Sequence, residues 1–385
     1  MFYYISFLRP PPAQASLTES ILITPQICND LRTEYFEGSI DIYYSWSLVQ
    51  PAPASPVITR PIKLTSWRTA NAYKGIPVPR PQSPTLRDGQ SWRLVLSAGG
   101  TRLDQMVCLG EQALGRTPFP VMSMPVRFGS RPSQRGDKQE QIVRSYMLRL
   151  PSQETPVIFV ILEQTSFDLD KKIWDSGIGL SSWLIQLFSG KLEESHLVAK
   201  LRQVLFGKER WNILELGAGT GIVAIALSIL RTKLELSGEP GHIVTTDLPS
   251  AMPILHQNID SNRHLTSNLS PIAAVLDWES EVLPPEIQCE SELDVIVMAD
   301  VTYNTSSFPA LIATLSRLVR FSEGRRKGHS PMILMGYKER DSAERALWDM
   351  VKCIHIEFQR VGEVKGAGGN AIEIWVGQVS GEGSG

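Results

Sequence analysis

Apolar residues in the second two thirds of the chain recur in short runs and in longer runs with helical spacing. Leu180, Trp183, Leu184 and Leu187 lie on one face of a helix, which predicts a helix over Gly177–Leu187. Strands are predicted over Val157–Gln164, Ile213–Leu216, His242–Thr246, Pro271–Leu276, Leu293–Ala299 and Pro331–Gly336. Further helices are predicted over Gly221–Ile229, Met252–Asn262, Phe308–Leu318 and Ser342–Met350. This alternation predicts an α/β fold with a doubly wound, Rossmann-like sheet.

The chain closes with two strand-like runs that have no helix between them. These runs are Ile354–Glu363 and Ala371–Gln378, and they are joined by Gly366-Ala367-Gly368-Gly369. A glycine-rich connection between two strands predicts an antiparallel hairpin at the edge of the sheet. We expect the sheet to have seven strands. The edge hairpin distinguishes it from the sheet of an ordinary dinucleotide-binding fold.

The first part of the chain has a different character. Of 26 prolines, 16 fall in residues 1–132, a density that disfavours helices and central strands. Trp92–Ser97 and Tyr146–Leu150 look like strands, and Ile27–Phe36 is predicted as one helix. We therefore expect an irregular, β-leaning N-terminal region of unknown role over residues 1–140. A polar linker, Arg131–Gln141, would lead into a second domain over residues 141–385.

Composition narrows the class of protein. The 385 residues are 42% hydrophobic, enough for a sizeable core, and the formal net charge of −2 gives no electrostatic case for nucleic acid. No apolar run reaches the length of a membrane span, and the short apolar start makes a poor signal peptide. The four cysteines form no C-x-x-C pair, so neither zinc nor a disulfide framework is expected. We expect no metal site, no membrane partner and a cytoplasmic location.

The most informative segment is the glycine-rich turn between a strand and a helix. Glu215 precedes Gly217, Gly219 and Gly221 in the pattern E-x-G-x-G-x-G. A dinucleotide site needs G-x-G-x-x-G, and a phosphate-binding loop needs a lysine that Ile222 does not supply. The pattern resembles the first motif of class I S-adenosylmethionine-dependent methyltransferases. An acidic turn suits that cofactor, because it carries an ammonium and a sulfonium but no phosphate.

Further candidate residues follow the other strands, since ligands of open α/β sheets bind beyond the carboxyl ends of the strands. Asp247 would accept the ribose hydroxyls of an adenosine, or else cap the following helix. Asp277 would accept from the adenine amino group and Trp278 would cover the ring, unless the indole is a core residue. Trp174, before the first helix, would line the same pocket or pack in the core, and Asp175 or Ser176 would cap that helix.

The fourth strand ends in Ala299-Asp300-Val301-Thr302-Tyr303. Methyltransferases that act on amide or adenine nitrogen carry Asn/Asp-Pro-Pro-Tyr here, whereas this chain has D-x-x-Y. A lysine ammonium needs a carboxylate to hold it and an aromatic wall to desolvate it, and Asp300 with Tyr303 supplies both. The alternative is a helix cap followed by a buried tyrosine.

In this order, the motifs resemble those of the seven-β-strand protein lysine methyltransferases, family 16, D-x-x-Y group. The resemblance covers about residues 155–380. It implies that S-adenosylmethionine is the cofactor and that the substrate is a lysine on a folded protein, such as a translation factor or chaperone. By this resemblance, the cofactor-binding residues are Trp174, Gly217, Ala218, Gly219, Asp247, Trp278 and Ala299. The residues themselves add Glu215, Gly221 and Asp277 to the cofactor site and make Asp300 and Tyr303 the catalytic candidates.

Three other functions stay open at the level of sequence. A small-molecule amine methyltransferase would have a closed aromatic lid over Asp300, whereas a protein substrate needs an open acidic groove. A non-catalytic scaffold with the same fold would need neither the glycines nor the D-x-x-Y motif. A dehydrogenase is disfavoured by Glu215 and by the glycine spacing.

Overall fold

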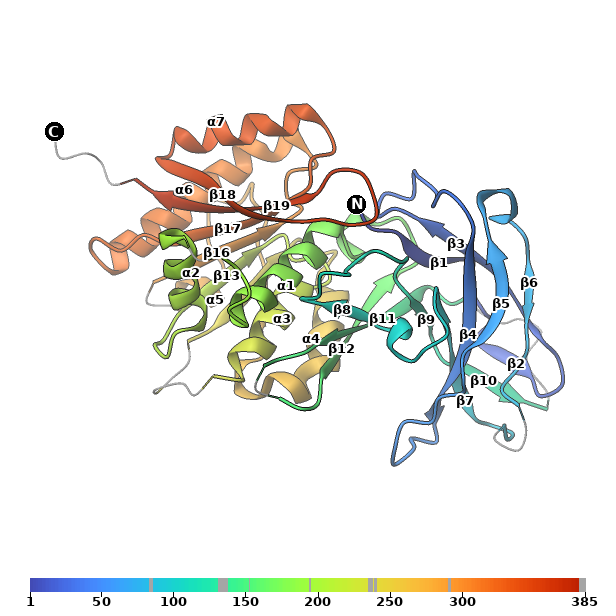
Figure 1. Cartoon of the computed structure of the whole chain (residues 1–385). Helices are drawn as coiled ribbons and strands as arrows, with labels where there is room; N and C mark the ends of the chain where they lie inside the picture. Colours follow the sequence, from blue (N-terminus) through green and yellow to red (C-terminus); the bar gives the residue numbers. More distant parts are fainter. Residues whose placement is uncertain are drawn as a thin grey trace.

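The computed structural model describes residues 1–82, 86–130, 138–151, 153–193, 195–234, 238, 241–289 and 292–380. An α/β part and a β-rich part lie side by side, and the N-terminus of the chain lies where they meet (Figure 1). The α/β part is built from the later residues of the chain, and the β-rich part from the earlier ones.

The α/β part is organised around a seven-stranded sheet in the order β15-β14-β13-β16-β17-β19-β18. The strands are β13 (Ile213–Leu216), β14 (Ile243–Asp247), β15 (Ile272–Val275), β16 (Val295–Ala299), β17 (Met332–Tyr337), β18 (Ile356–Val364) and β19 (Ile372–Val379). The first five are parallel, while β19 runs antiparallel to both β17 and β18. The doubly wound sheet with an antiparallel edge hairpin is confirmed.

Helices cover both faces of this sheet. The helices are α1 (Asp175–Phe188), α2 (His196–Phe206), α3 (Ile222–Arg231), α4 (Met252–Thr266), α5 (Pro285–Gln288), α6 (Phe308–Arg325) and α7 (Ala346–Lys352). Apolar residues of α1 to α4 share a core with Ile213 and Val295, and those of α5 to α7 share a second core with Leu214 and Ile296. Successive residues of one strand thus face opposite helical layers, as buried parallel strands require.

The β-rich part holds two further sheets. Strands β1 (Tyr4–Arg9), β3 (Ile21–Cys28) and β6 (Ile76–Val78) form the smaller sheet. The larger sheet contains nine strands: β2 (Gln14–Ser16), β4 (Ile40–Gln50), β5 (Ile62–Trp67), β7 (Ser91–Ser97), β8 (Val107–Leu109), β9 (Val121–Ser123), β10 (Val126–Gly129), β11 (Gln141–Leu148) and β12 (Val157–Gln164). Apolar residues of both sheets form a third core, whereas most buried apolar residues of β8, β11 and β12, such as Val107, Tyr146 and Phe159, belong to the first core with α1 to α4.

Two asparagines of α4 join the α/β part to the β-rich part. Asn258 and Asn262 lie one helical turn apart, on the face of α4 that packs against β12. The Asn258 carboxamide accepts from the Leu162 N–H at 2.7 Å and donates to the Leu162 oxygen at 3.1 Å. Asn262 pairs in the same way with Val160, at 3.0 and 2.7 Å. Side-chain amides therefore satisfy the backbone groups that edge strand β12 would otherwise leave unpaired.

Two predictions from the sequence are wrong. Val157–Gln164 is a strand, but it pairs antiparallel with β11 and so belongs to the N-terminal sheet and not to the α/β part. Ile27–Phe36 is not a helix: β3 runs to Cys28 and a turn follows. The Asn29 side-chain oxygen accepts the N–H groups of Thr33 and Glu34, and this local bonding competes with helix formation.

Two other expectations fall partly outside the described residues. Most of the linker Arg131–Gln141 lies there, and so does much of the loop after α3 that lengthens the spacing to Asp247. The domain division at residue 140 remains a prediction. Among the residues that the structure describes, no helix is both long enough and apolar enough to cross a membrane.

Candidate active site

A cavity of about 820 Å³ opens where β13, β14, β15 and β16 end. This is the position at which open α/β sheets bind ligands. Eleven of the twelve site residues predicted from sequence line it: Trp174, Glu215, Gly217, Ala218, Gly219, Asp247, Asp277, Trp278, Ala299, Asp300 and Tyr303. The twelfth, Gly221, does not line the cavity but is the N-cap residue of α3.

The glycine turn has the left-handed backbone that its sequence predicts. Gly217 and Gly219 have φ angles of 67° and 53°. A Cβ on Gly217 would lie 2.8 Å from the Val301 side chain and 3.5 Å from the Trp278 ring, inside the cavity wall. The Ala218 N–H donates to the Thr246 oxygen at 3.0 Å, which ties the turn to the neighbouring strand. The turn is therefore a fixed, open backbone surface against which a ligand can lie.

Asp247, the last residue of β14, fixes the turn from the other side. Its two carboxylate oxygens accept from the N–H groups of Gly219 at 2.6 Å and Leu248 at 2.7 Å. Burial raises the pKa of this carboxyl, and these two hydrogen bonds oppose the rise. The residue that caps α4 is Ala251, so Asp247 does not have the helix-capping role considered for it. Contact with a ribose remains a prediction.

Glu215 lies at the base of the cavity and is buried. One of its oxygens accepts from the Thr245 hydroxyl at 2.6 Å. Burial raises the pKa of the Glu215 carboxyl to about 8, and nearby Asp247 adds to the rise. A buried carboxyl whose hydrogen-bond partners are neutral favours a cation in the space above it, because a cation would offset the cost of its charge.

Asp277 and Trp278 follow β15 on the far side of the turn. Asp277 is exposed and accepts from the Glu279 N–H at 3.0 Å. The Trp278 backbone oxygen accepts from the hydroxyl of Thr314 in α6 at 3.1 Å, which fixes the Trp278 backbone against that helix. The Trp278 ring is half-buried and lies next to Gly217 in the cavity wall.

Trp174 lies opposite, just before α1. Its indole N–H donates to the Leu169 oxygen at 2.8 Å. The Lys172 ammonium nitrogen lies 4.3 Å from the centroid of a Trp174 ring, and burial lowers the Lys172 pKa to about 8. The Trp174 ring therefore forms one wall of the cavity and is also held by a cation.

Asp300, the first residue after β16, has an unusual environment. It is buried and has a φ of 61°, a left-handed conformation that costs a non-glycine residue free energy. Both of its oxygens accept from the guanidinium of Arg340, and one of these contacts is 2.9 Å long. The Ser176 N–H donates to the same carboxylate at 3.3 Å. The sequence predicted that this carboxylate holds the substrate lysine. In the structure it is paired with Arg340, and contact with a lysine remains a prediction.

Tyr303 lies at the mouth of the cavity with 55% of its surface exposed. Partial burial and the neighbouring carboxylates of Asp247, Asp170 and Asp300 raise the pKa of its phenol. The alternative of a buried tyrosine is excluded. The residue that caps the following helix is Asn304, which accepts from the Ser306 N–H, and not Asp300.

Sequence reasoning missed Lys338 and Arg340, and it missed Asp30 and Asp175 as their partners. Arg340 follows β17, so the strand-end argument that found Asp300 would have found it too. Asp30 gave no signal, because its turn was predicted as a helix. Among the described residues, no group of His, Cys, Asp and Glu is arranged to hold a metal ion.

Comparison with known proteins identifies the family. Residues 153–353, just over half of the chain, match the model of a family described as lysine methyltransferase. The chain belongs to the lysine methyltransferase family. The matched span runs from β12 to α7 and so contains every element that lines the cavity.

Named relatives agree with this family. EEF1A lysine methyltransferase 3 of Xenopus tropicalis is 34% identical over 145 residues, which are 37% of this chain and 53% of that protein. Protein-lysine N-methyltransferase EFM6 of Saccharomyces cerevisiae is 26% identical over 186 residues, covering 47% and 68% of the two chains. A third relative, UPF0665 family protein C23C4.06c of Schizosaccharomyces pombe, is 28% identical over 185 residues, which are 48% of this chain and 47% of that protein. The chain thus spans about half the length of the frog and fission yeast relatives. Among solved structures, magnesium protoporphyrin IX methyltransferase from Synechocystis matches 48% of this chain and 74% of its own, at 14% identity and a TM-score of 0.31.

Proposed function

We propose that this protein is an S-adenosylmethionine-dependent N-methyltransferase that methylates a lysine on a folded protein. One observation carries the proposal. In a chain of the lysine methyltransferase family, a single cavity brings together the glycine turn after β13, Asp247 after β14 and the Asp300–Tyr303 motif after β16. We place the chain in the D-x-x-Y group of that family on the same motif.

The cavity suits this cofactor in size and chemistry. Its volume of about 820 Å³ lies in the range of small-molecule sites. Gly217 and Gly219 would hold the methionine part, with buried Glu215 facing its cationic groups; Asp247 would take the ribose, and Trp278 the adenine. S-adenosylmethionine supplies an electrophilic methyl group on a sulfonium. An additional carboxylate oxygen of Asp170, buried and without a hydrogen-bond partner in the part of the chain described, also lines this cavity and favours a cationic ligand.

The chain's own residues would prepare the lysine. A lysine with a pKa near 10.4 costs about 4–5 kcal/mol to neutralise at pH 7, at about 1.36 kcal/mol per pKa unit. Tyr303 and the apolar cavity wall would lower this cost by desolvation. Both oxygens of Asp300 already accept hydrogen bonds from Arg340, so we assign Asp300 to orienting the amine and not to accepting its proton. The ammonium proton would pass to water before the neutral amine takes the methyl group. Most of the rate would then come from alignment.

The mouth of the cavity supports a protein substrate over a small amine. Four large apolar residues on the mouth are 38–55% exposed: Phe167, Leu169, Leu248 and Tyr303. The carboxylates of Asp168, Asp277 and Glu279 are exposed beside them. A small-molecule enzyme would close aromatics over Asp300, whereas this mouth offers apolar and acidic contacts to a surface that carries a lysine.

The name of one relative supports a first choice of substrate. The frog relative is named for EEF1A, so we propose EEF1A as the first substrate to test, with a chaperone as the alternative. We also infer a cytoplasmic location, because all four cysteines are unpaired and this target is a translation factor. Binding to nucleic acid or to a membrane is no part of this proposal.

Calorimetric titration of the purified protein with S-adenosylmethionine and, separately, with NAD tests the cofactor assignment. The proposal expects binding of S-adenosylmethionine in the micromolar range and no heat from NAD. Binding of NAD alone would contradict it. Binding of neither would favour a scaffold with this fold.

A further inference from the structure

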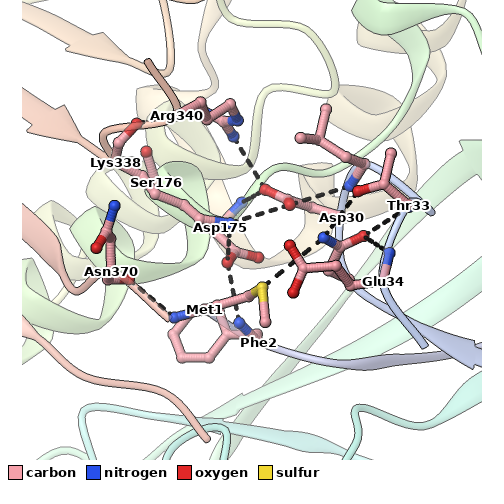
Figure 2. A network of polar contacts seen from close by, with 12 residues as sticks. Met1, Phe2, Asp30, Thr33, Glu34, Asp175, Ser176, Lys338, Arg340 and Asn370 are labelled. Atoms are coloured by element: carbon pink, nitrogen blue, oxygen red, sulfur yellow. Dashed lines mark hydrogen bonds and ion pairs between the residues drawn. The ribbon is translucent and has the colours of Figure 1, made fainter. Parts of the chain in front are cut away.

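A buried ionic cluster joins the N-terminal β-rich part to the candidate active site. We call Asp30, Asp175, Lys338 and Arg340 the junction cluster (Figure 2). Asp30 comes from the turn after β3, Asp175 from the start of α1, and the two cations from the segment after β17. The side chains of Asp30 and Asp175 are fully buried, and those of Lys338 and Arg340 are 6% and 11% exposed.

Two cations share the two carboxylates. The Lys338 ammonium contacts Asp30 at 3.0 Å and Asp175 at 2.8 Å. The Arg340 Nη2 contacts Asp30 Oδ2 at 2.9 Å, and the Asp175 N–H donates to that same oxygen at 3.3 Å. Burial opposes the charge of Asp30, but Lys338 and Arg340 outweigh it and lower the Asp30 pKa. Each of the four groups therefore has a partner of opposite charge, as buried charges require, although burial and neighbouring Asp30 raise the pKa of Asp175.

Arg340 links this cluster to Asp300. Its Nη2 lies 2.9 Å from a carboxylate oxygen of Asp30 and 2.9 Å from one of Asp300, while Nη1 contacts the second Asp300 oxygen. Burial opposes the Arg340 charge, yet Asp300 and Asp30 together raise its pKa. One planar guanidinium thus bridges a turn of the N-terminal region and the residue predicted to orient the substrate amine.

The Arg340 bridge helps to hold the strained backbone of Asp300. A non-glycine residue at a φ of 61° persists only when its surroundings hold it there. Arg340 and the Ser176 N–H make the side-chain contacts that hold it. Arg340 is held in turn by Asp30 and lies 5.2 Å from the centroid of a Trp174 ring.

We propose that the N-terminal β-rich part completes the active site, with Asp30 acting as a positioning residue for Asp300 through Arg340. This inference rests on the proposed methyl transfer and assigns a role to a region that the family match does not reach. Without the Asp30 carboxylate, Arg340 keeps one carboxylate partner instead of two and can rotate. Asp300 then loses its fixed orientation, while the glycine turn and Asp247 keep theirs.

The test compares Asp30→Asn with Glu34→Gln in the full-length protein. Glu34 is an exposed carboxylate in the same turn, so both variants remove one negative charge from one loop. For Asp30→Asn we expect kcat to fall about 10- to 100-fold, the effect of a small misplacement. The dissociation constant for S-adenosylmethionine should stay at the wild-type value. Hydrogen exchange over residues 299–304 should become faster. Glu34→Gln should match the wild type in all three.

Each outcome decides the matter. If Asp30→Asn folds and matches Glu34→Gln in either kcat or hydrogen exchange, the positioning role is overturned. If Asp30→Asn does not fold, Arg340→Lys replaces it, because lysine keeps the charge but cannot bridge two carboxylates with a fork. That variant should show the same loss of kcat and the same faster exchange, and a normal value for either would overturn the inference. A wild-type protein that transfers no methyl group would contradict the proposed function, and exchange over residues 299–304 would still decide whether Asp30 positions Asp300.

Discussion

The backbone N–H of Gly219 donates to the carboxylate of Asp247 at 2.6 Å, so the glycine turn and the end of the next strand form one unit. Asp247 is therefore a candidate ligand for the cofactor ribose, and it also stabilises the conformation of the glycine turn. Loss of its carboxylate would affect both roles. This pairing gives the cofactor site its most direct mutational test.

We predict that Asp247→Ala raises the dissociation constant for S-adenosylmethionine about 10- to 100-fold, the size expected for losing hydrogen bonds to a charged group. Calorimetric titration measures this effect. Asp260→Ala, which removes an exposed carboxylate from α4, is the matched control and should bind normally. An unchanged constant for Asp247→Ala would remove the residue from the site.

Asp300→Asn should retain cofactor affinity but lose turnover. An amide cannot pair with Arg340 through two oxygens, and it holds an ammonium less strongly than a carboxylate does. Single-turnover rates measured alongside the dissociation constant separate the two effects, and we expect the rate to fall about 100-fold. Melting temperature is measured in parallel, because removing one partner of a buried ion pair also destabilises the fold. Normal turnover in a folded variant would show that Asp300 is not part of the chemistry.

Gly217→Ala should abolish cofactor binding. A methyl group at this position would lie 2.8 Å from the Val301 side chain and would fill the surface against which the ligand lies. Gly328→Ala is the matched control, because Gly328 has a similar φ of 76° and its added methyl group would have no heavy atom within 4 Å. Both variants should lose about 1 kcal/mol or more of stability from backbone strain. If Gly217→Ala binds the cofactor as Gly328→Ala does, the turn is not the binding surface.

Glu215 should make folding stability depend on pH. Its pKa is about 8 in the folded protein, against 4.5 for an unperturbed glutamate, so the folded chain binds more protons between these values. Stability is then fully present below pH 4.5 and falls as the pH rises through 8, because ionisation charges a buried group. Melting curves from pH 5 to 9 for the wild type and Glu215→Gln measure this contribution. The variant should lose less stability across this range. Parallel curves for the two proteins would contradict the assignment.

Local sequence patterns were enough for much of the fold and for most of the site. The glycine spacing, the apolar strands and the residues that follow them are features of neighbouring positions. The carboxyl ends of parallel strands meet at one edge, which brought Asp247, Asp277 and Asp300 to one cavity. The edge hairpin was predicted from the lack of a helix between two strands.

Contacts between distant parts of the chain could not be predicted from local sequence patterns. Arg340 lies 310 residues from Asp30, and nothing in either segment indicates the other. Strand β12 has the length and composition of a buried α/β strand, yet its antiparallel pairing with β11 places it in the N-terminal sheet. The turn that carries Asp30 depends on a hydrogen bond from the Thr33 N–H to the side chain of Asn29. The pattern of apolar residues gives no indication of that bond.

The most direct test of the central claim is methyl transfer itself. Purified protein is incubated with S-adenosylmethionine and EEF1A, and mass spectrometry locates any methyl group on the product. The Asp300→Asn variant is the inactive control, and a cell lysate is a second source of substrates. We predict methylation of a lysine by the wild type and a large loss of it in the variant. Methylation at oxygen, on a small molecule only, or at the same rate in both proteins would contradict the account.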